Sequence, residues 1–370
     1  MNPLMDLILK IYSSLSRQNS LFLLVAIYNR LFFYYLLYAV ETDKLSKVYS
    51  SGLKAVDEIS IKLENGEIFG FLGPNGAGKS TTIMILTTLL KPTSGKAFVA
   101  GFDVTTQAKN VRQNIGYVQQ DSTVDEYLTG RENLELQARL NHIPKNIRTK
   151  RIDEILEIIE LADRQNEAAV TYSGGMRKRL DIGGGLLNMP KVLFLDEPTL
   201  GLDIQTRYKI WEYIKKIHDE FGMSIFLTTH YMEEADKLCN NISIIDNGKI
   251  KVTGSPKELK SSLGNEIVIF EIDSEEKLEK LVSEIRNIST VKDVSTNGTI
   301  VTVFTTGGEQ LTPQIFQQAN SLQIKIETIS LTKPTLDDVF LSHTGRELRD
   351  DEGKYDRKKI RERLRRIRAT

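Results

Sequence analysis

One stretch constrains this chain more than any other, the loop Gly73-Pro74-Asn75-Gly76-Ala77-Gly78-Lys79-Ser80-Thr81. Its three glycines permit backbone angles that other residues avoid, so successive N–H groups can turn inward around phosphate oxygens. Lys79 is expected to reach the β- and γ-phosphates of a nucleotide, and the Ser80 hydroxyl to bind Mg²⁺. A strand-like run over 67–72 precedes the loop and a helix-like run over 81–86 follows it. This setting, with the positive end of the helix at the loop, favours a nucleotide site over a surface turn.

Bulk composition narrows the possible partners and the redox setting. The 370 residues are enough for more than one domain. Lys and Arg together number 49, as do Asp and Glu, so the whole chain has no net charge to attract nucleic acid. The single cysteine, Cys239, excludes an internal disulfide and suits a reducing compartment. It lies in a helical pattern, where a small buried side chain is expected rather than a reactive thiol.

Residues 1–40 differ from the rest of the chain. Leu21 to Val40 forms an apolar run of twenty residues, interrupted by Asn29 and Arg30, which is long enough to cross a bilayer. A charge in the middle of such a segment is unfavourable by about 3 kcal/mol. Three interpretations compete: a membrane-associated amphipathic leader, a single anchor helix, or an extension that the native protein lacks because its start lies near Val40. We favour the third, because the segment carries nothing that the later domains need.

From residue 41 to 63, apolar and polar residues alternate as in half-exposed strands, and Asn65-Gly66 is expected to form a hairpin turn. Tyr49 lies in this region, where it is either a core residue or a platform for an adenine ring. Further along, a short strand over 115–118 ends in Gln119-Gln120. A glutamine there can coordinate Mg²⁺ through its carbonyl oxygen or orient water. Composition does not decide which of the two does so.

Two more strands end in polar residues that fit a nucleotide site. A continuous apolar run over 191–195 has the pattern of a buried parallel strand. It ends in Asp196 and Glu197, at the edge where open α/β sheets bind their ligands. We assign Asp196 to Mg²⁺ and Glu197 to polarising the attacking water. A strand over 224–229 ends in His230, which is either a structural histidine or a γ-phosphate contact.

Between these strands the chain changes to a helical insert over about 121–190, and Thr129 is expected to cap its first helix. Tyr172-Ser173-Gly174-Gly175-Met176 is a second glycine-containing turn that opens a helix. Gly183-Gly184-Gly185 interrupts this helix, and each glycine is unfavourable by about 1 kcal/mol relative to alanine. The triplet either permits close packing or leaves the helix less rigid.

These motifs together identify a family. Residues 41–262 resemble the nucleotide-binding domain of ABC transporters, whose six motifs occur here in the family's order. The resemblance implies an α/β fold: a P-loop NTPase with a RecA-like core, an antiparallel β subdomain and a helical signature subdomain. The motifs are a Walker A loop at Gly73 to Ser80, a glutamine loop at Gln120, the signature at Tyr172 to Met176, Walker B through Asp196-Glu197, a D-loop at Leu200 to Asp203 and the switch histidine His230.

The resemblance also implies roles. It selects Gln120 over Gln119 as the catalytic and Mg²⁺-binding glutamine, and it favours adenine stacking by Tyr49. Methionine at 176 departs from the family's usual glutamine. In the family the signature faces an ATP bound on a second subunit, so each site is built from two chains in a head-to-tail dimer. The residues expected to act in trans are Ser173, Gly174, Gly175 and Asp203.

The C-terminal region has its own pattern. Over 263–346, strands and helices follow the order β-α-β-β-α-β with a turn at Asn297-Gly298, which is typical of a small α+β ferredoxin-like domain. This region resembles the C-terminal domain of daunorubicin-resistance-type exporter ATPases. Residues 347–370 form a basic tail, with nine basic and two acidic residues after position 353. The tail is either an amphipathic helix on an anionic membrane surface or a solvated segment.

The resemblance therefore implies an ATP- and Mg²⁺-dependent ATPase subunit of an ABC exporter for drugs or other amphiphilic substrates. Its expected partners are an integral membrane permease and a second copy or a related ATPase, with no nucleic acid. Its expected place is the cytoplasmic face of the cell membrane, as a peripheral subunit. The rival hypotheses are an importer ATPase and a soluble ABC-type ATPase acting on DNA or ribosomes.

Overall fold

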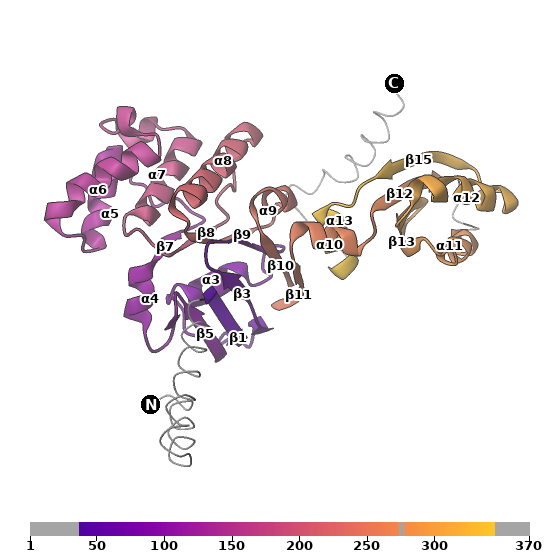
Figure 1. Ribbon diagram of the computed structural model, residues 1–370, viewed down its shortest axis with the longest axis horizontal. Coiled ribbons are helices and arrows are strands. Elements are labelled where there is room, and N and C mark those ends of the chain that lie inside the picture. Colours follow the sequence, from indigo (N-terminus) through magenta and orange to yellow (C-terminus); the bar gives the residue numbers. More distant parts are fainter. Residues whose placement is uncertain (1–36, 274–275, 277, 345–370) are drawn as a thin grey trace, which may run out of the picture. The chain divides into compact units, whose positions relative to one another are not determined.

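A computed structural model describes residues 37–273, 276 and 278–344, which form two compact units (Figure 1). The predicted basic tail and almost all of the predicted leader lie outside these residues. No helix in the described ranges is long and apolar enough to span a membrane. The first unit contains residues 37–69, 78–228 and 247–249, and the second contains 70–77, 229–246 and 250–344.

An antiparallel sheet opens the first unit. It has five strands in the order β2-β1-β5-β6, with β3 paired to β1. β1 already pairs Tyr38 with Glu64 and Val40 with Leu63, so the predicted domain start at residue 41 falls inside this strand and the sheet begins earlier than expected. The strands are β1 (Tyr38–Val48), β2 (Lys54–Ile59), β3 (Lys62–Glu64), β5 (Ser94–Val99) and β6 (Phe102–Asp103).

The turn at Asn65-Gly66 does not form the predicted hairpin. β3 before the turn pairs with β1, whereas β4 (Ile68–Leu72) after it belongs to a second sheet. The Gly66 N–H donates to the Ser224 hydroxyl at 2.9 Å. The turn therefore carries the chain between two sheets, because a two-residue turn pattern does not specify the partner of the strand that follows.

The second sheet has six strands in the order β11-β10-β4-β9-β8-β7. β8 is parallel to both β7 and β9, and every residue of β4, β8 and β9 is buried. This confirms the buried parallel strand predicted before Glu197. The remaining strands and the helix after β4 are β7 (Ile115–Val118), β8 (Val192–Asp196), β9 (Ser224–Thr229), β10 (Asn241–Asp246), β11 (Lys249–Gly254) and α3 (Lys79–Leu86).

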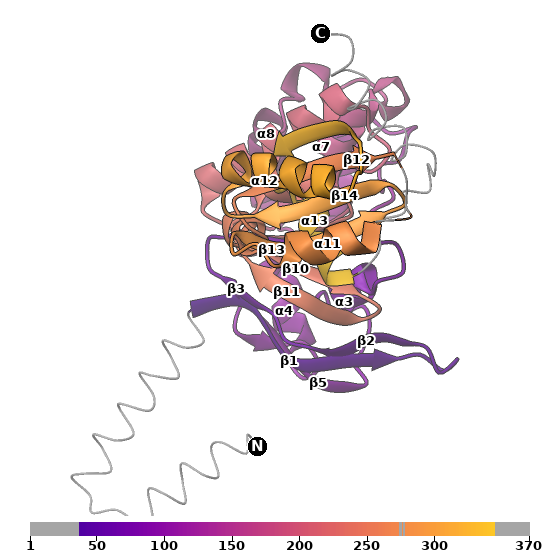
Figure 2. The ribbon, with the colours of Figure 1, turned by 90° about the vertical axis from the view of Figure 1, so that its right-hand side faces the viewer.

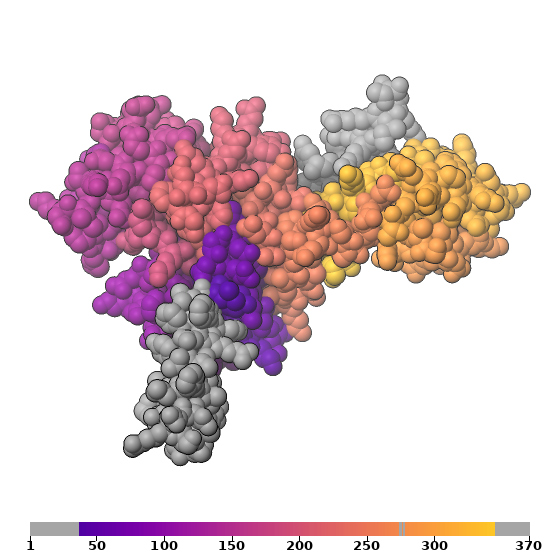
Figure 3. Space-filling model, viewed as in Figure 1, coloured from indigo at the N-terminus to yellow at the C-terminus, as the bar shows by residue number. Residues whose placement is uncertain are grey.

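A group of packed helices follows β7 in the first unit, and the magenta residues in Figure 3 show α5, α6 and α7 as one lobe. The predicted cap of α5 is confirmed: the Thr129 hydroxyl accepts from the Glu132 N–H, and the Glu132 carboxylate accepts from the Thr129 N–H. The helices of this lobe are α5 (Gly130–Leu140), α6 (Lys145–Ile158) and α7 (Gly174–Leu186). Of the other helices in this unit, α4 (Ala108–Asn114) precedes β7, and α8 (Ile204–Phe221) follows β8 and packs against α7.

The glycine triplet lies inside α7, which is continuous through it. A Cβ at Gly183 would lie 3.0 Å from the Ile159 side chain, and one at Gly184 would lie 1.8 Å from the Gln137 amide oxygen. On the β7 side, a Cβ at Gly116 would lie 2.2 Å from the carbonyl oxygen of Gly185. The triplet therefore lets α7 approach its neighbours more closely than any side chain would allow, and the expected interruption of the helix does not occur.

The β-α-β-β-α-β order predicted for the C-terminal region is confirmed (Figures 1 and 2). Its four strands have the order β13-β14-β12-β15 with antiparallel neighbours, and Asn297 pairs with Ile300 at the predicted turn. This is the ferredoxin-like arrangement. The elements are β12 (Glu266–Ile272), α11 (Leu278–Arg286), β13 (Val291–Asn297), β14 (Ile300–Thr305), α12 (Gly308–Ser321) and β15 (Ile326–Thr332).

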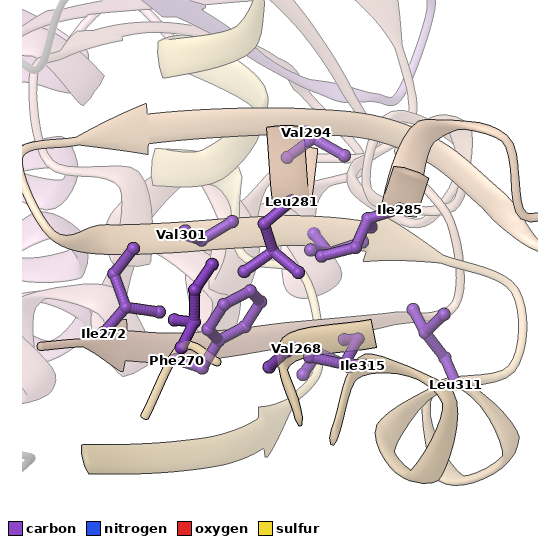
Figure 4. Packing of buried hydrophobic residues seen from close by; sticks show 12 residues of the cluster. Val268, Phe270, Ile272, Leu281, Ile285, Val294, Val301, Leu311 and Ile315 are labelled. Carbon is purple, nitrogen blue, oxygen red and sulfur yellow. The ribbon is translucent and has the colours of Figure 1, made fainter. Parts of the chain in front are cut away.

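This small domain has its own apolar core. Leu281 of α11 and Ile315 of α12 pack with Val268 and Phe270 of β12, so both helices cover the same face of the sheet (Figure 4). A self-contained core of this kind is the mark of a structural domain.

The chain then returns to the helices at the start of the second unit. α13 (Leu336–Thr344) packs against α9 (Met232–Leu238) and α10 (Pro256–Ser262). Its apolar residues Leu336, Val339 and Phe340 are buried. The last described helix therefore belongs with the helix that follows His230.

The backbone contact between β7 and α7 gives the first prediction. Gly116→Ala should lower the free energy of unfolding by about 3 kcal/mol, because the new methyl group would overlap the backbone of Gly185. Gly307→Ala is the control, since Gly307 has a negative φ and no neighbour of its Cβ position closer than 3.8 Å. Its effect should stay within about 0.5 kcal/mol. Thermal unfolding followed by circular dichroism measures both, and equal melting temperatures would contradict the packing argument.

Candidate active site

The predicted phosphate loop lies between β4 and α3. Gly76 and Gly78 have φ values of +79° and +109°, left-handed conformations that glycine adopts without strain. The Gly73 N–H donates to the Thr229 carbonyl at 3.2 Å, and a Cβ at Gly73 would lie 2.3 Å from the Ile245 carbonyl oxygen. The loop therefore needs two glycines for backbone angles and one for space.

Lys79, the first residue of α3, meets the end of β8. Its Nζ lies 2.9 Å from Glu197 Oε1, and the two side chains are only 5% and 6% exposed. Because a buried charge is unfavourable without a partner, each of these groups depends on the other in this structure. The structure thus brings together the Walker A lysine and the residue predicted to polarise water.

Asp196, the last residue of β8, is held by two hydroxyl groups. Its Oδ1 accepts from the Thr228 hydroxyl and lies 3.4 Å from the Ser80 hydroxyl. Burial raises the pKa of the Asp196 carboxyl, while the two hydrogen bonds act in the opposite direction. On the neighbouring strand β7, burial and the Asp196 carboxylate raise the pKa of Tyr117 to about 12. Asp196 is therefore enclosed from several sides.

Glu197 has an unusual backbone. Its φ is +47°, a left-handed value that is uncommon outside glycine, asparagine and aspartate. Its N–H donates to both the carbonyl oxygen and the hydroxyl of Thr228, each at 3.1 Å. Its own carbonyl accepts from the Leu200 N–H at 3.2 Å. These bonds hold a conformation that turns the side chain out of the strand direction, toward Lys79.

Gln120 is placed by the signature helix. The ammonium group of Lys178 donates to the carbonyls of Gln119 and Gln120 at 3.2 and 3.4 Å. The Asp181 carboxylate accepts from the N–H and hydroxyl of Thr123. In the described part of the chain, the exposed side chain of Gln120 makes no hydrogen bond to Ser80 or Asp196. The structure therefore fixes the backbone of this segment without bringing the glutamine to the predicted metal ligands.

Lys178 and Asp181 were not singled out from the sequence. Both side chains are buried, at 8% and 5% exposure, although charged residues are rarely buried without a partner. A lysine and an aspartate on the apolar side of a helix are the signal that could have found them.

The residues predicted to act in trans form a second cluster. The Ser173 hydroxyl caps α7 by accepting from the Met176 N–H, and Asp203 caps α8 by accepting from Thr206. Hydrogen bonds from Thr206 lower the pKa of Asp203. A Cβ at Gly175 would lie 2.7 Å from the Thr206 side chain. Within the described ranges, neither the Ser173 nor the Asp203 side chain bonds to the phosphate loop of its own chain.

Two further candidates, Tyr49 and His230, have aromatic rings. The Tyr49 hydroxyl is 3.3 Å from the Thr81 hydroxyl, and its half-exposed ring has the Lys47 ammonium 5.7 Å from its centroid. Tyr49 is thus beside the phosphate loop and is not a fully buried core residue. His230 stacks on Tyr231, with ring centroids 4.1 Å apart.

The residues present fit Mg²⁺ bound together with a nucleotide. Hydroxyl and carboxylate oxygens are the donors that Mg²⁺ prefers, and in nucleotide sites one or two carboxylates suffice beside phosphate oxygens and water. Ser80 and Asp196 supply one donor of each kind. Among the residues that the structure describes, no group of three or more His, Cys, Asp and Glu could hold a metal by itself.

Comparisons with known proteins agree with this geometry. A family model for ABC transporters matches residues 56–200, and a model for the C-terminal domain of DrrA1-3-like ATP-binding proteins matches residues 254–344. The daunorubicin/doxorubicin resistance ATP-binding protein DrrA of Streptomyces peucetius is 38% identical over 310 residues, which is 83% of this chain and 92% of that protein. The chain belongs to the daunorubicin-resistance type of ABC transporter ATP-binding proteins.

Other relatives of this ABC protein support the same assignment. The linearmycin resistance ATP-binding protein LnrL of Bacillus subtilis is 34% identical over 84% of the chain and 100% of that protein. Among solved structures, cbiO1 of Clostridium perfringens, part of an ABC transporter complex, has a TM-score of 0.57 at 29% identity over 60% of this chain and 90% of its own. The cassette MJ0796, a dimer in a post-hydrolysis state with ADP and Pi, has a TM-score of 0.53 at 28% identity, over 58% and 98%. The predicted family and fold are confirmed, and ATP hydrolysis is the general activity of the family.

The buried ion pair gives the second prediction. In nucleotide-free protein, a double-mutant cycle with Lys79→Met and Glu197→Gln should give a coupling energy of about 3 kcal/mol, because each single change removes the opposite charge that lies beside a buried charged group. The control pair is Lys150 and Glu154, whose side chains are 84% and 43% exposed. Its coupling should be about 0.5 kcal/mol or less. Urea unfolding measures both cycles, and equal couplings would show that burial adds nothing to the Lys79–Glu197 pair.

Proposed function

We propose that this ABC protein is the ATP-hydrolysing subunit of an exporter that removes drugs or other amphiphilic compounds through separate membrane-spanning subunits. One observation carries the proposal. Relatives named for resistance to daunorubicin, doxorubicin and linearmycin match the ATPase domain and the C-terminal domain together, over most of their length. The C-terminal domain is therefore shared with resistance proteins and is not a property of ABC ATPases in general.

The nucleotide is held mainly by backbone groups. The N–H groups of the loop from Gly73 to Ser80, at the N-terminus of α3, surround the phosphates. Pro74, Asn75 and Ala77 shape this loop, and Thr81 follows it on α3. Tyr49 offers its half-exposed ring to the adenine. When bound with the nucleotide, Mg²⁺ neutralises phosphate charge, and Ser80 and Asp196 would hold it, with Gln120 as a further ligand.

Exchange of partners by Lys79 links nucleotide binding to hydrolysis. The ammonium group lies 2.9 Å from the Glu197 carboxylate and neutralises it. A phosphate group competes for the same ammonium, and Lys79 then leaves the carboxylate. The freed Glu197 orients the attacking water and accepts its proton, while His230 contacts the γ-phosphate. The left-handed backbone of Glu197 keeps the carboxylate aimed at this position.

The second half of each site comes from another subunit. Ser173 and Gly175, with Gly174 and Asp203 beside them, approach the γ-phosphate of a nucleotide on the partner in a head-to-tail dimer. Among the described residues, the side chains of Ser173 and Asp203 bond only within their own helix caps, which leaves this cluster available to a partner. The partner is a second copy or a related ATPase. The complex acts at the cytoplasmic face of the membrane, bound to an integral membrane permease.

The rival functions require sequence features that differ from those of an exporter ATPase. An importer would use the same ATPase domain, and the resistance relatives argue against it through the shared C-terminal domain. Soluble relatives that act on chromosomes have a long coiled coil between Walker A and the signature, and ribosome-acting relatives carry two ATPase units. Neither feature occurs in this sequence.

Glu197→Gln tests the hydrolytic role. The variant should bind ATP more tightly than the wild type, because Lys79 no longer neutralises a carboxylate, and hydrolysis should fall about 10²- to 10⁴-fold with loss of the base. ATP retention and dimer formation are measured by size-exclusion chromatography with labelled ATP. Glu157→Gln, at an exposed site of α6, is the control. Wild-type turnover by Glu197→Gln would remove Glu197 from the mechanism.

Drug export is tested in cells. The chain, expressed with its membrane-spanning partner, should lower accumulation of a fluorescent anthracycline, and Lys79→Ala should abolish the effect. The chain should also co-purify with that partner from membranes. Increased accumulation with the wild type would favour an importer, and equal accumulation with wild type and Lys79→Ala would separate drug transport from ATP hydrolysis.

A further inference from the structure

Thr228 connects the two carboxylate residues at the end of β8. It is fully buried in β9, opposite Asp196 in the parallel register. Its hydroxyl donates to Asp196 Oδ1 and accepts from the Glu197 N–H at 3.1 Å. A carboxylate only accepts and a backbone N–H only donates, so the single hydroxyl proton must go to Asp196. Both bonding capacities of this hydroxyl are thus used within the site.

We propose that Thr228 is a positioning residue for ATP hydrolysis, whose one hydroxyl sets the Mg²⁺-binding carboxylate and the backbone of the catalytic glutamate relative to each other. The proposal rests on the proposed function through the roles given there to Asp196 and Glu197. Thr228 touches neither nucleotide nor metal in this scheme. It acts only through its two neighbours.

The carboxylate of Asp196 shows what the hydroxyl achieves. The hydrogen bonds that this group accepts from Thr228 and Ser80 both go to Oδ1. In the described part of the chain Oδ2 accepts no hydrogen bond. Hydrogen bonds to one oxygen restrain the rotation of a carboxylate about its Cβ–Cγ bond, and the other oxygen keeps its lone pairs for a cation. Thr228 therefore prevents rotation of the group that would bind Mg²⁺.

The hydrogen bond that the Thr228 hydroxyl accepts acts on Glu197. Its φ of +47° is maintained by surrounding contacts, since an unsupported glutamate would leave the left-handed region. The hydroxyl of Thr228 shares the Glu197 N–H with the Thr228 carbonyl. Loss of the hydroxyl leaves the hydrogen bond from the Glu197 N–H to the Thr228 carbonyl. The pairing of β8 with β9 is therefore kept, while the backbone of Glu197 is held less firmly. A valine of the same shape would preserve packing and remove only the hydrogen bonds.

Thr42 offers a matched control. It is 2% exposed in β1, and its hydroxyl donates to the Ile59 carbonyl at 3.2 Å and accepts from the Ile61 N–H at 2.8 Å. Thr42→Val thus removes a buried hydroxyl that also donates once and accepts once, in the antiparallel sheet. Loss of such a hydroxyl should destabilise both variants, whereas only Thr228→Val should weaken metal binding.

The test measures metal binding and turnover in the full chain. Mn²⁺ serves as the probe for the Mg²⁺ site, and its binding in the presence of a non-hydrolysable ATP analogue is followed by electron paramagnetic resonance. ATPase rates are measured over a Mg²⁺ titration. Thr228→Val should weaken Mn²⁺ binding and raise the half-saturating Mg²⁺ concentration by about 10- to 100-fold. Thr228→Ser, which keeps the hydroxyl, should stay within about 3-fold of the wild type on the same scale.

The outcomes separate the two proposals. Wild-type Mn²⁺ affinity in Thr228→Val, or an equal loss in Thr42→Val, would overturn the positioning role. Should Thr228→Val fail to fold, Thr228→Ala and Thr228→Ser form the comparison, and a failure of serine to restore the alanine defect would overturn it equally. A wild-type chain without Mg²⁺-dependent ATP hydrolysis would instead refute the proposed function, whatever the Mn²⁺ binding of the variants.

Discussion

The buried ion pair between Lys79 and Glu197 is the interaction on which the active site depends. It joins the start of α3 to the end of β8, two segments far apart in sequence, at a separation of 2.9 Å. Two opposite charges with almost no solvent contact offset each other's loss of hydration. The pair is therefore electrically balanced. In the proposed mechanism, an anionic ligand that draws Lys79 away from Glu197 would link nucleotide binding to the proposed role of Glu197 as the base.

Much of this site could be predicted from sequence, because its chemistry lies in short runs with local meaning. A glycine loop between a strand and a helix, and an apolar strand ending in two carboxylates, define the positions of Lys79, Asp196 and Glu197. The predictions that failed, or were not made, concern contacts between segments that are far apart in the sequence. Asn65-Gly66 resembles a hairpin because the turn pattern does not reveal which strand pairs with which. The hydroxyl of Thr228 becomes informative only when β9 lies beside β8.

The residues of the second cluster have two uses. Ser173 and Asp203 each cap a helix, and the close approach of Gly175 to Thr206 brings the two helix starts together. Caps are worth about 1 kcal/mol each, so the fold alone accounts for serine and aspartate at these positions. In the proposed dimer the same polar groups, at the positive ends of α7 and α8, would face a phosphate on another subunit. The structural role of these residues and the role proposed for them are therefore compatible at the same positions.

The three glycines of α7 have a mechanical consequence. A helix separated from its neighbours by side chains can absorb a small displacement when those side chains change rotamer. At Gly185 no side chain intervenes, since its carbonyl oxygen lies against Gly116 of β7, whereas Gly183 and Gly184 face the side chains of Ile159 and Gln137. Lys178 and Asp181 of the same helix hold the segment that carries Gln120. One continuous helix therefore joins that segment and the strand before it to the signature at Ser173.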